Sequence, residues 1–331
     1  MNKIRKDILK GSAGCIILMI LIFILILIAI KVGSIEVTYK EIFEGLFVKF
    51  NRKIYTIYNL RFPRIIVALL GGASLSLSGL LFQAILRNPL ADPGVIGICG
   101  GASFTALIIS TFFPSLYFYT PIIAFIGGFL AFILIYSLAW KESLDPTKII
   151  LIGIAVASIF TGLSEILKGM ANRTGVLVSV SGLTQLVWED VKVLFIYSII
   201  GIIGAIIIAP ACNILELNDK TVRGLGVNIN VLRFIISIVA VLLASGITAV
   251  VGVIGFLGLI VPHIARKIIG ADHRILVPFC TLLGGFTLLL ADTLGRLIAI
   301  PNEIPAAIIM SVIGGPFFII LLKRSDNHAK H

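Results

Sequence analysis

The chain of 331 residues is poor in charge: only 13% of its residues are Asp, Glu, Lys or Arg, whereas 59% are hydrophobic. Its mean hydropathy is +1.12. A water-soluble domain of this length could not remove so much apolar surface from water. The composition therefore excludes an ordinary soluble protein and predicts an all-α integral membrane protein.

Cysteine is also scarce, and no two of the four cysteines are close in the sequence. They are Cys15, Cys99, Cys212 and Cys280. Their positions in or beside apolar stretches favour buried free thiols over disulfides or a metal site. His263 and His273 lie ten residues apart without further ligands of clear geometry, so we expect structural roles for both and no bound metal.

A phosphate-binding loop is missing as well. No Gly-x-x-x-x-Gly-Lys-Ser/Thr sequence occurs, and no polar stretch is long enough for a nucleotide-binding domain. We therefore expect no catalytic residues and no cofactor bound by this chain. If the protein moves a solute uphill, the energy comes from an ion gradient or from a separate subunit.

Long apolar stretches are abundant, and nine of them can each cross a membrane as a helix. They are 12–32, 62–86, 94–113, 121–140, 149–167, 191–211, 231–251, 276–295 and 304–322. A shorter piece at 252–262 makes about ten; it is expected to end at Pro262, which lacks a backbone donor. The first stretch is interpreted as a span rather than a signal peptide, because it is long and Lys31 follows it.

Ten crossings that begin inside place both termini in the cytoplasm. The segments on the inner side then hold more than half of the 27 Lys and Arg residues but half of the 16 acids, which is the direction of the positive-inside rule. The expected extracytoplasmic loop 33–60 is nevertheless basic, so we expect its cations to have a function on the extracytoplasmic side. We treat 1–331 as a single transmembrane domain.

A series of motifs follows in order along the chain. They are Arg61-Phe-Pro-Arg64, Arg87-Asn-Pro-Leu-Ala-Asp-Pro93, Gly255-Phe-Leu-Gly-Leu-Ile-Val-Pro-His263, Asp272-His-Arg274 and Glu303-Ile-Pro305. Over about 61–322 the series resembles the FecCD-type permeases, the membrane subunits of ABC importers for iron-siderophores, haem and cobalamin. The sequence departs from the family pattern at Ala307, where the family usually has glycine, and around 178–188.

The resemblance implies a ten-helix permease subunit in the bacterial cytoplasmic membrane. It implies a second permease subunit, identical or homologous, a cytoplasmic ABC ATPase dimer that uses ATP, and an extracytoplasmic substrate-binding protein. The cargo would be an iron(III)-siderophore or a related metal chelate such as haem or cobalamin. The alternative is a stand-alone ion-coupled secondary transporter, which needs ionisable groups near mid-membrane; only Asp292 and Glu165 come close.

Three arginines are candidates for docking the binding protein. Arg61 and Arg64 are three residues apart, so a helix would place both guanidinium groups on one side, and Arg296 lies at the outer end of another span. Guanidinium binds carboxylate through two parallel hydrogen bonds, and the matching arginines of the family contact glutamates of the binding protein. Anchoring to lipid headgroups, or an ion pair of Arg296 with Asp292, are the alternatives.

The connector 213–230 is the candidate for coupling to the ATPase. Its coupling residues are Asp219, Lys220, Arg223, Gly224, Leu225 and Gly226. The glycines permit a sharp backbone path, and the matching family segment lies in a groove of the ATPase; an ordinary cytoplasmic loop is the alternative.

Two further features concern the translocation pathway. Pro146 and Thr147 match family residues near a cytoplasmic constriction, although by themselves they read equally as a turn and a helix cap. The proline-broken segments near 89–93 and 252–262 predict an inverted repeat.

Overall fold

The computed structural model describes residues 3–33, 35, 37–47, 52–139, 146–173, 182–299 and 302–328, and within them it is helical without any strand. The longer helices are α1 (Lys3–Lys31), α3 (Arg52–Leu86), α4 (Ile98–Phe112), α5 (Thr120–Ala139), α6 (Pro146–Arg173), α7 (Trp188–Leu215), α9 (Ile229–Val251), α10 (Leu257–Ile269), α11 (His273–Ile298) and α12 (Ala306–His328). The short helices are α2 (Tyr39–Phe47), the 3-10 helix η1 (Pro114–Tyr119) and α8 (Asp219–Gly224).

The all-α membrane architecture is confirmed. Among the described residues, seven helices are long and apolar enough to cross a membrane, and α4 and residues 306–321 of α12 form shorter apolar helices. Together with α10, every apolar stretch expected from the sequence contains or overlaps a helix. The cytoplasmic placement of the two termini stays a prediction.

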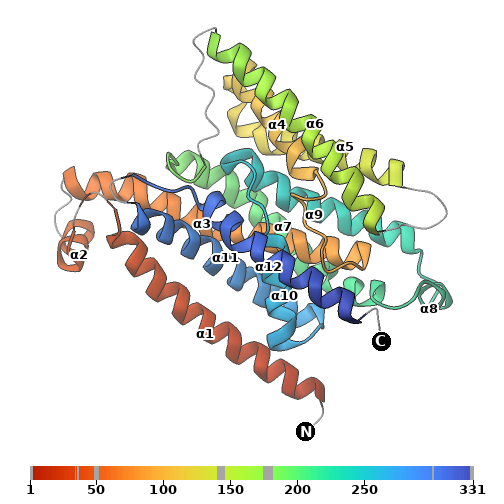
Figure 1. Cartoon of the computed structure of the whole chain (residues 1–331). Helices are drawn as coiled ribbons and strands as arrows, with labels where there is room; N and C mark the ends of the chain where they lie inside the picture. Colours follow the sequence, from red (N-terminus) through yellow and green to blue (C-terminus); the bar gives the residue numbers. More distant parts are fainter. Residues whose placement is uncertain are drawn as a thin grey trace.

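The helices run between two ends of the molecule (Figure 1). One end carries α2 and the beginning of α3, and we call it the α2 end. The other carries α8 and is called the α8 end; both chain termini lie toward it. Between them α3 is the central helix, buried along most of its length and packed against α7, α9, α10 and α11.

Two sets of four helices have the same order and opposite directions. In the first set α3 runs toward the α8 end and α4, α5 and α6 follow; in the second α9 starts at the α8 end and α10, α11 and α12 follow. In each set an irregular segment separates the first two helices, at 87–97 and at 252–256. This is the arrangement expected of an inverted repeat.

The expectation that the short apolar helix ends at Pro262 is wrong. α10 begins at Leu257 and continues through Pro262. Pro262 has no N–H to donate to the carbonyl oxygen of Gly258, but the side-chain amide of Gln83 on α3 donates to that oxygen at 3.1 Å. The carbonyl is therefore satisfied by a neighbouring helix, which is how proline is tolerated within a membrane bundle.

Glycine brings α3 against its neighbours at two places. A Cβ added to Gly79 would lie 2.1 Å from the carbonyl oxygen of Gly258 in α10, and one added to Gly72 would lie 2.2 Å from that of Gly284 in α11. Such contact requires residues without side chains on facing helices. Gly72 and Gly79 thus belong to the packing surface of α3 against α11 and α10.

The expected outer loop 33–60 is partly helical. It contains α2, and α3 already begins at Arg52, so the Arg61–Arg64 motif lies inside a long helix rather than at its start. Of the divergent stretch 178–188, residues 178–181 lie outside the described residues. Trp188 begins α7, and its ring packs against that of Tyr58 in a tilted arrangement with the centroids 4.9 Å apart.

Candidate functional sites at the two ends of the bundle

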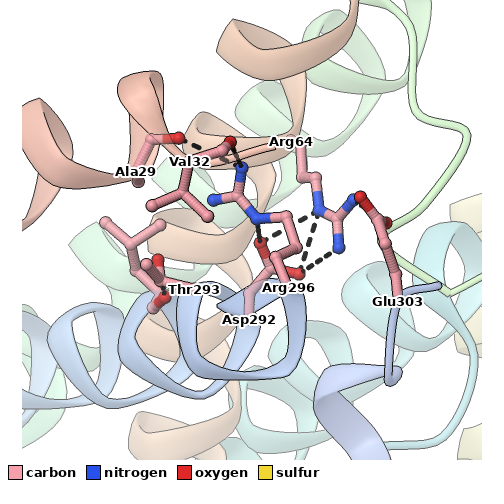
Figure 2. Close-up of polar contacts among 8 residues, drawn as sticks. Ala29, Val32, Arg64, Asp292, Thr293, Arg296 and Glu303 are labelled. Carbon is pink, nitrogen blue, oxygen red and sulfur yellow. Dashed lines mark hydrogen bonds and ion pairs between the residues drawn. The ribbon is translucent and has the colours of Figure 1, made fainter. Parts of the chain in front are cut away.

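A buried ion pair joins α3 to α11 at the α2 end. Arg64 donates from Nε and Nη2 to the carboxylate of Asp292, with the shortest distance 2.7 Å, and Figure 2 shows this paired contact. The Nη1 atom of Arg64 also lies 2.5 Å from Oε2 of Glu303. The side chain of Asp292 is fully buried, so the carboxylate depends on its guanidinium partners for stabilisation.

Arg61 and Arg296 bind the end of α1. Arg61 donates to the carbonyl oxygens of Ile30 and Lys31 and to that of Ile35, at 2.6 to 3.3 Å. Arg296 donates to the carbonyl oxygens of Ala29 and Val32, both at 3.0 Å (Figure 2). The last carbonyls of a helix have no partners within it and carry partial negative charge. The two arginines therefore cap α1.

The structure brings the three candidate docking arginines together but buries them, with 8%, 6% and 3% of Arg61, Arg64 and Arg296 exposed. A cavity of about 110 Å³ is lined by all three and by Glu303. Within the described residues, Nη2 of Arg296 is buried and makes no hydrogen bond. The alternative ion pair of Arg296 with Asp292 is also present, with Nε of Arg296 lying 3.3 Å from Oδ2 of Asp292.

At the opposite end, α8 is a short capped helix inside the expected coupling connector. The side chain of Asn218 accepts hydrogen bonds from the backbone N–H of Thr221 at 2.8 Å and from its hydroxyl at 2.6 Å. Val222 is fully buried and holds the helix against the bundle. Asp219 forms ion pairs with Arg87 at 2.6 Å and with Arg233 at 3.7 Å.

The remaining coupling residues of this segment face outward. They are Lys220, Arg223, Gly224, Leu225 and Gly226, all of them exposed. Leu225 has 61% of its surface exposed, and a Cβ added to either glycine would meet no atom within 4 Å. Gly226 has a φ of 76°, a conformation that glycine adopts without strain. The α8 end therefore presents an exposed apolar side chain and two exposed cations on one short segment.

Pro146 and Thr147, the expected gate residues, form the first turn of α6. Their side chains lie outside the described residues, so their role as a gate stays a prediction. Further along α6, Gly153 packs against the irregular segment 87–97. A Cβ added to Gly153 would lie 2.7 Å from the carbonyl oxygen of Ile96.

Four polar residues that the sequence analysis left without a role form a network around this segment. Gln83 donates to Gly258 and accepts a hydrogen bond from Arg266. Arg87 binds the end of α7 through the carbonyl of Leu215. Asp92, only 1% exposed, accepts hydrogen bonds from backbone N–H groups of its own loop and of α10. Arg87 and Asp92 lie in one of the sequence motifs, whereas Gln83 and Arg266 lie in none of them. The hydrogen bonds that join this group to α7 and α10 connect positions far apart in the chain.

The Asp272-His-Arg274 motif closes the turn between α10 and α11. Hydrogen bonds from Arg274 and Asn213 to the Asp272 carboxylate hold the pKa of that group well below its usual range. The carboxylate also accepts from the backbone N–H of Arg274 and so caps α11. His273 is buried and lies beside Asn213, whereas His263 packs edge-on against Phe317.

The two acids that an ion-coupled transporter would require are both held by cations. Asp292 is bound by Arg64 and Arg296. Glu165, on α6, lies 2.8 Å from Nζ of Lys168. A carboxylate that binds and releases an ion has to be vacant in one state, and ion pairing disfavours this use.

Comparisons with known proteins give matches over nearly the whole chain. Residues 20–324 match the model of the FecCD transport family. The chain is 38% identical over 301 residues to a Staphylococcus aureus (strain Newman) protein described as the probable heme-iron transport system permease protein IsdF, covering 91% of this chain and 92% of that protein. The corresponding protein of strain MSSA476 is 39% identical over 316 residues, covering 94% and 97%.

Two solved structures share the fold. One is an inward-facing conformation of a protein assigned to the metal-chelate type of ABC transporters; it has a TM-score of 0.78 and 27% identity and covers 95% of this chain and 99% of that one. The other is PsaBC from Streptococcus pneumoniae in complex with Fab, with a TM-score of 0.58 and 17% identity, covering 86% and 95%. The second likeness concerns the fold alone.

Replacing Asp292 by Ala tests the energetic role of the buried ion pair. The change leaves Arg64 and Arg296 without their buried counter-charge, which costs about 3–5 kcal/mol when one partner of such a pair is removed. We expect a marked fall in the midpoint of thermal unfolding in detergent, followed by the reaction of a thiol dye with the buried cysteines.

The matched control is the double variant Arg64→Met/Asp292→Leu, which removes the Arg64–Asp292 pair. Because Arg296 still lacks its carboxylate partner, the variant should recover part of the loss. Glu303→Gln, at the partly exposed rim of the cluster, should change the midpoint far less. An Asp292→Ala protein as stable as the wild type would show that the ion pair is not needed.

Proposed function

Because the chain belongs to the FecCD transport family, we propose that it forms the pathway for an iron-containing metal chelate, with haem as the first candidate. The protein is a multi-pass permease subunit of an ABC importer in the cytoplasmic membrane, and it is not an enzyme. Two observations support the cargo: the IsdF relatives are named as heme-iron permeases, and the similar inward-facing structure is assigned to the metal-chelate type. Iron-siderophores and cobalamin are the other members of the same cargo class.

The energy for transport is proposed to come from a separate ATPase dimer that binds at the α8 end. The chain has no phosphate loop, so nucleotide hydrolysis has to take place on a partner. The exposed Leu225, flanked by open glycine positions, offers a small apolar knob for a groove on that partner. Lys220 and Arg223 add positive charge around it, which favours an acidic rim on the ATPase.

The binding protein is proposed to dock at the α2 end through the cluster of Arg61, Arg64 and Arg296. The cavity of about 110 Å³ gives a carboxylate access to the three guanidinium groups, and the Nη2 atom of Arg296 is a donor with unused capacity within the described residues. Glu303, whose side chain is 32% exposed, already places its carboxylate against one of these guanidinium groups, that of Arg64. A partner carboxylate would take a place like that of Glu303.

The complete importer is proposed to contain a second permease subunit, either another copy of this chain or a homologue. The pathway then lies between the two subunits, and its inner constriction is formed at Pro146 and Thr147, where α6 begins. In this arrangement the N- and C-termini and α8 all face the cytoplasm, so ATP acts on the side opposite to cargo delivery.

Transport that depends on the ATPase is the central test. Proteoliposomes containing the permease, the ATPase and the binding protein encoded beside it should accumulate haem only when ATP is supplied. Because no ion gradient drives the step, a protonophore should leave the uptake rate within about twofold, a difference of less than about 0.5 kcal/mol. The measurement is the absorbance of haem inside the vesicles after the binding protein is washed away. Accumulation by the purified permease alone under an ion gradient would contradict the proposal.

Arg61→Gln tests docking without removing the partner of a buried acid, because its hydrogen bonds within the described residues all go to backbone carbonyls. The change weakens the cap of α1, so the midpoint of thermal unfolding is measured beside the affinity. We expect the affinity for the binding protein to fall about tenfold, which is 1.4 kcal/mol, and to become less sensitive to salt. Surface plasmon resonance on nanodisc-embedded protein measures both. Lys53→Gln, which changes an exposed cation on the same helix, is the control, and an unchanged affinity for Arg61→Gln would count against docking at this cluster.

Leu225→Glu tests the coupling surface. The change replaces an exposed apolar side chain by a charge on a face with free space, so we expect folding to be retained but ATPase binding to weaken at least tenfold, or about 1.4 kcal/mol. Val231→Glu, an exposed change outside α8, should have a smaller effect. Size-exclusion chromatography of the mixed subunits gives the readout, and normal assembly of Leu225→Glu would remove α8 from the interface.

A further inference from the structure

Arg87 occupies a junction that the proposed function leaves unexplained. It follows the last residue of α3 and is the first residue of the irregular segment 87–97. Its guanidinium donates from Nε to the carbonyl oxygen of Leu215 at 2.5 Å and from Nη2 to that of Leu217, and Nη1 lies 2.6 Å from Oδ1 of Asp219. One side chain therefore binds the end of α7, the connector after it and the first residue of α8.

The backbone of Arg87 is held in an unfavourable conformation. Its φ is 48°, in the left-handed region, and the next residue, Asn88, donates its N–H to the carbonyl oxygen of Gln83 at 3.2 Å. Helices commonly end this way, but the residue in that position is usually glycine. A side chain in this region carries a strain that persists only when the surroundings enforce it. The contacts of the guanidinium with Leu215, Leu217 and Asp219 hold the backbone of Arg87 in this conformation.

The segment that Arg87 begins contacts both α10 and α6. The carboxylate of Asp92 accepts hydrogen bonds from the backbone N–H of Gly94, in its own loop, and from that of Gly258, near the start of α10. Further along, Ile96 and Gly97 pack on α6, because a Cβ on Gly97 would lie 2.7 Å from the carbonyl oxygen of Gly153. The segment is short between these contacts. Asp92, five residues after Arg87, contacts α10, and Gly97, ten residues after it, contacts α6, so a displacement of Arg87 is passed to both helices.

We propose that Arg87 is the positioning residue that transmits a displacement of α8 to segment 87–97, and through that segment to α6 and α10. The proposal rests on the proposed function, since it takes the ATPase to act on α8. The alternative is that Arg87 is only a cap for α7. A cap would need the two carbonyl contacts alone, whereas the ion pair with Asp219 ties the same guanidinium to the helix that the partner would move.

Arg87→Gly separates these roles, because glycine adopts the positive φ without strain and removes the side chain that carries the guanidinium. The complete complex of permease, ATPase and binding protein is reconstituted in liposomes, with haem as the cargo. The readout is the number of haem molecules delivered per ATP hydrolysed. A cap that only stabilises the fold changes the amount of assembled complex but leaves this ratio unchanged.

We expect the ratio to fall at least tenfold for Arg87→Gly. Arg87→Lys keeps the charge beside Asp219 but cannot reach both carbonyls at once, so its ratio should fall at least threefold. The matched control is Arg233→Gln, which removes the other cation near Asp219 from α9, a helix that does not begin segment 87–97. Its ratio should stay within twofold of the wild type.

A ratio for Arg87→Gly within twofold of the wild type, or equal losses for Arg87→Gly and Arg233→Gln, would overturn the proposal. Loss of the ATPase from a folded Arg87→Gly complex would also overturn it, because Arg87 would then serve assembly. If Arg87→Gly does not fold, Arg87→Lys tests the proposal. A threefold fall in its ratio of haem delivered to ATP hydrolysed supports the proposal, and an unchanged ratio overturns it. Failure of the proposed function itself would appear in the wild-type complex, as uptake without ATP.

Discussion

Every backbone polar group that lies deep in a membrane protein needs a partner within the protein, because the lipid offers none and each unsatisfied group costs about several kcal/mol. In this bundle the interrupted and terminal helix ends create such groups, and side chains of α3 or of the residues just after it satisfy many of them. Arg61 binds the end of α1, Gln83 replaces the donor that Pro262 lacks, and Arg87 binds the end of α7. The central helix thus holds its neighbours through their ends as well as through apolar packing.

This constraint also explains why the charged residues lie where they do. The arginines that serve α1 gather at the α2 end with Asp292 and Glu303, and the arginine that serves α7 reaches α8 at the opposite end. In an ABC permease one end receives a loaded binding protein and the other an ATPase. A helix whose ends are both fixed by charged contacts is suited to link the two events, and segment 87–97 beside it connects that helix to α6 and α10.

The sequence predicted the class of fold and the number of apolar helices, because hydropathy records directly which stretches can lie in lipid. It also singled out the Arg61-Phe-Pro-Arg64 motif and the polar connector that contains α8, whose roles in docking and coupling stay predictions. It placed Pro262 at the end of a helix instead of within one, since the compensating donor, Gln83, is far away in the sequence. For the same reason the burial of Arg64 against Asp292 was not foreseen: an exposed and a buried arginine look alike until the partner is known. Arg87 belonged to a recognised motif, yet only the structure gives its contacts.

Coupling through Arg87 requires α8 and segment 87–97 to move as one unit. Spin labels at exposed positions of α8, at Pro89 and on α1 allow the distances among the three to be measured in the assembled importer with and without ATP. The account predicts that the distance from α8 to position 89 stays constant while both shift relative to α1. A change in the distance between α8 and position 89, with position 89 fixed relative to α1, would contradict it.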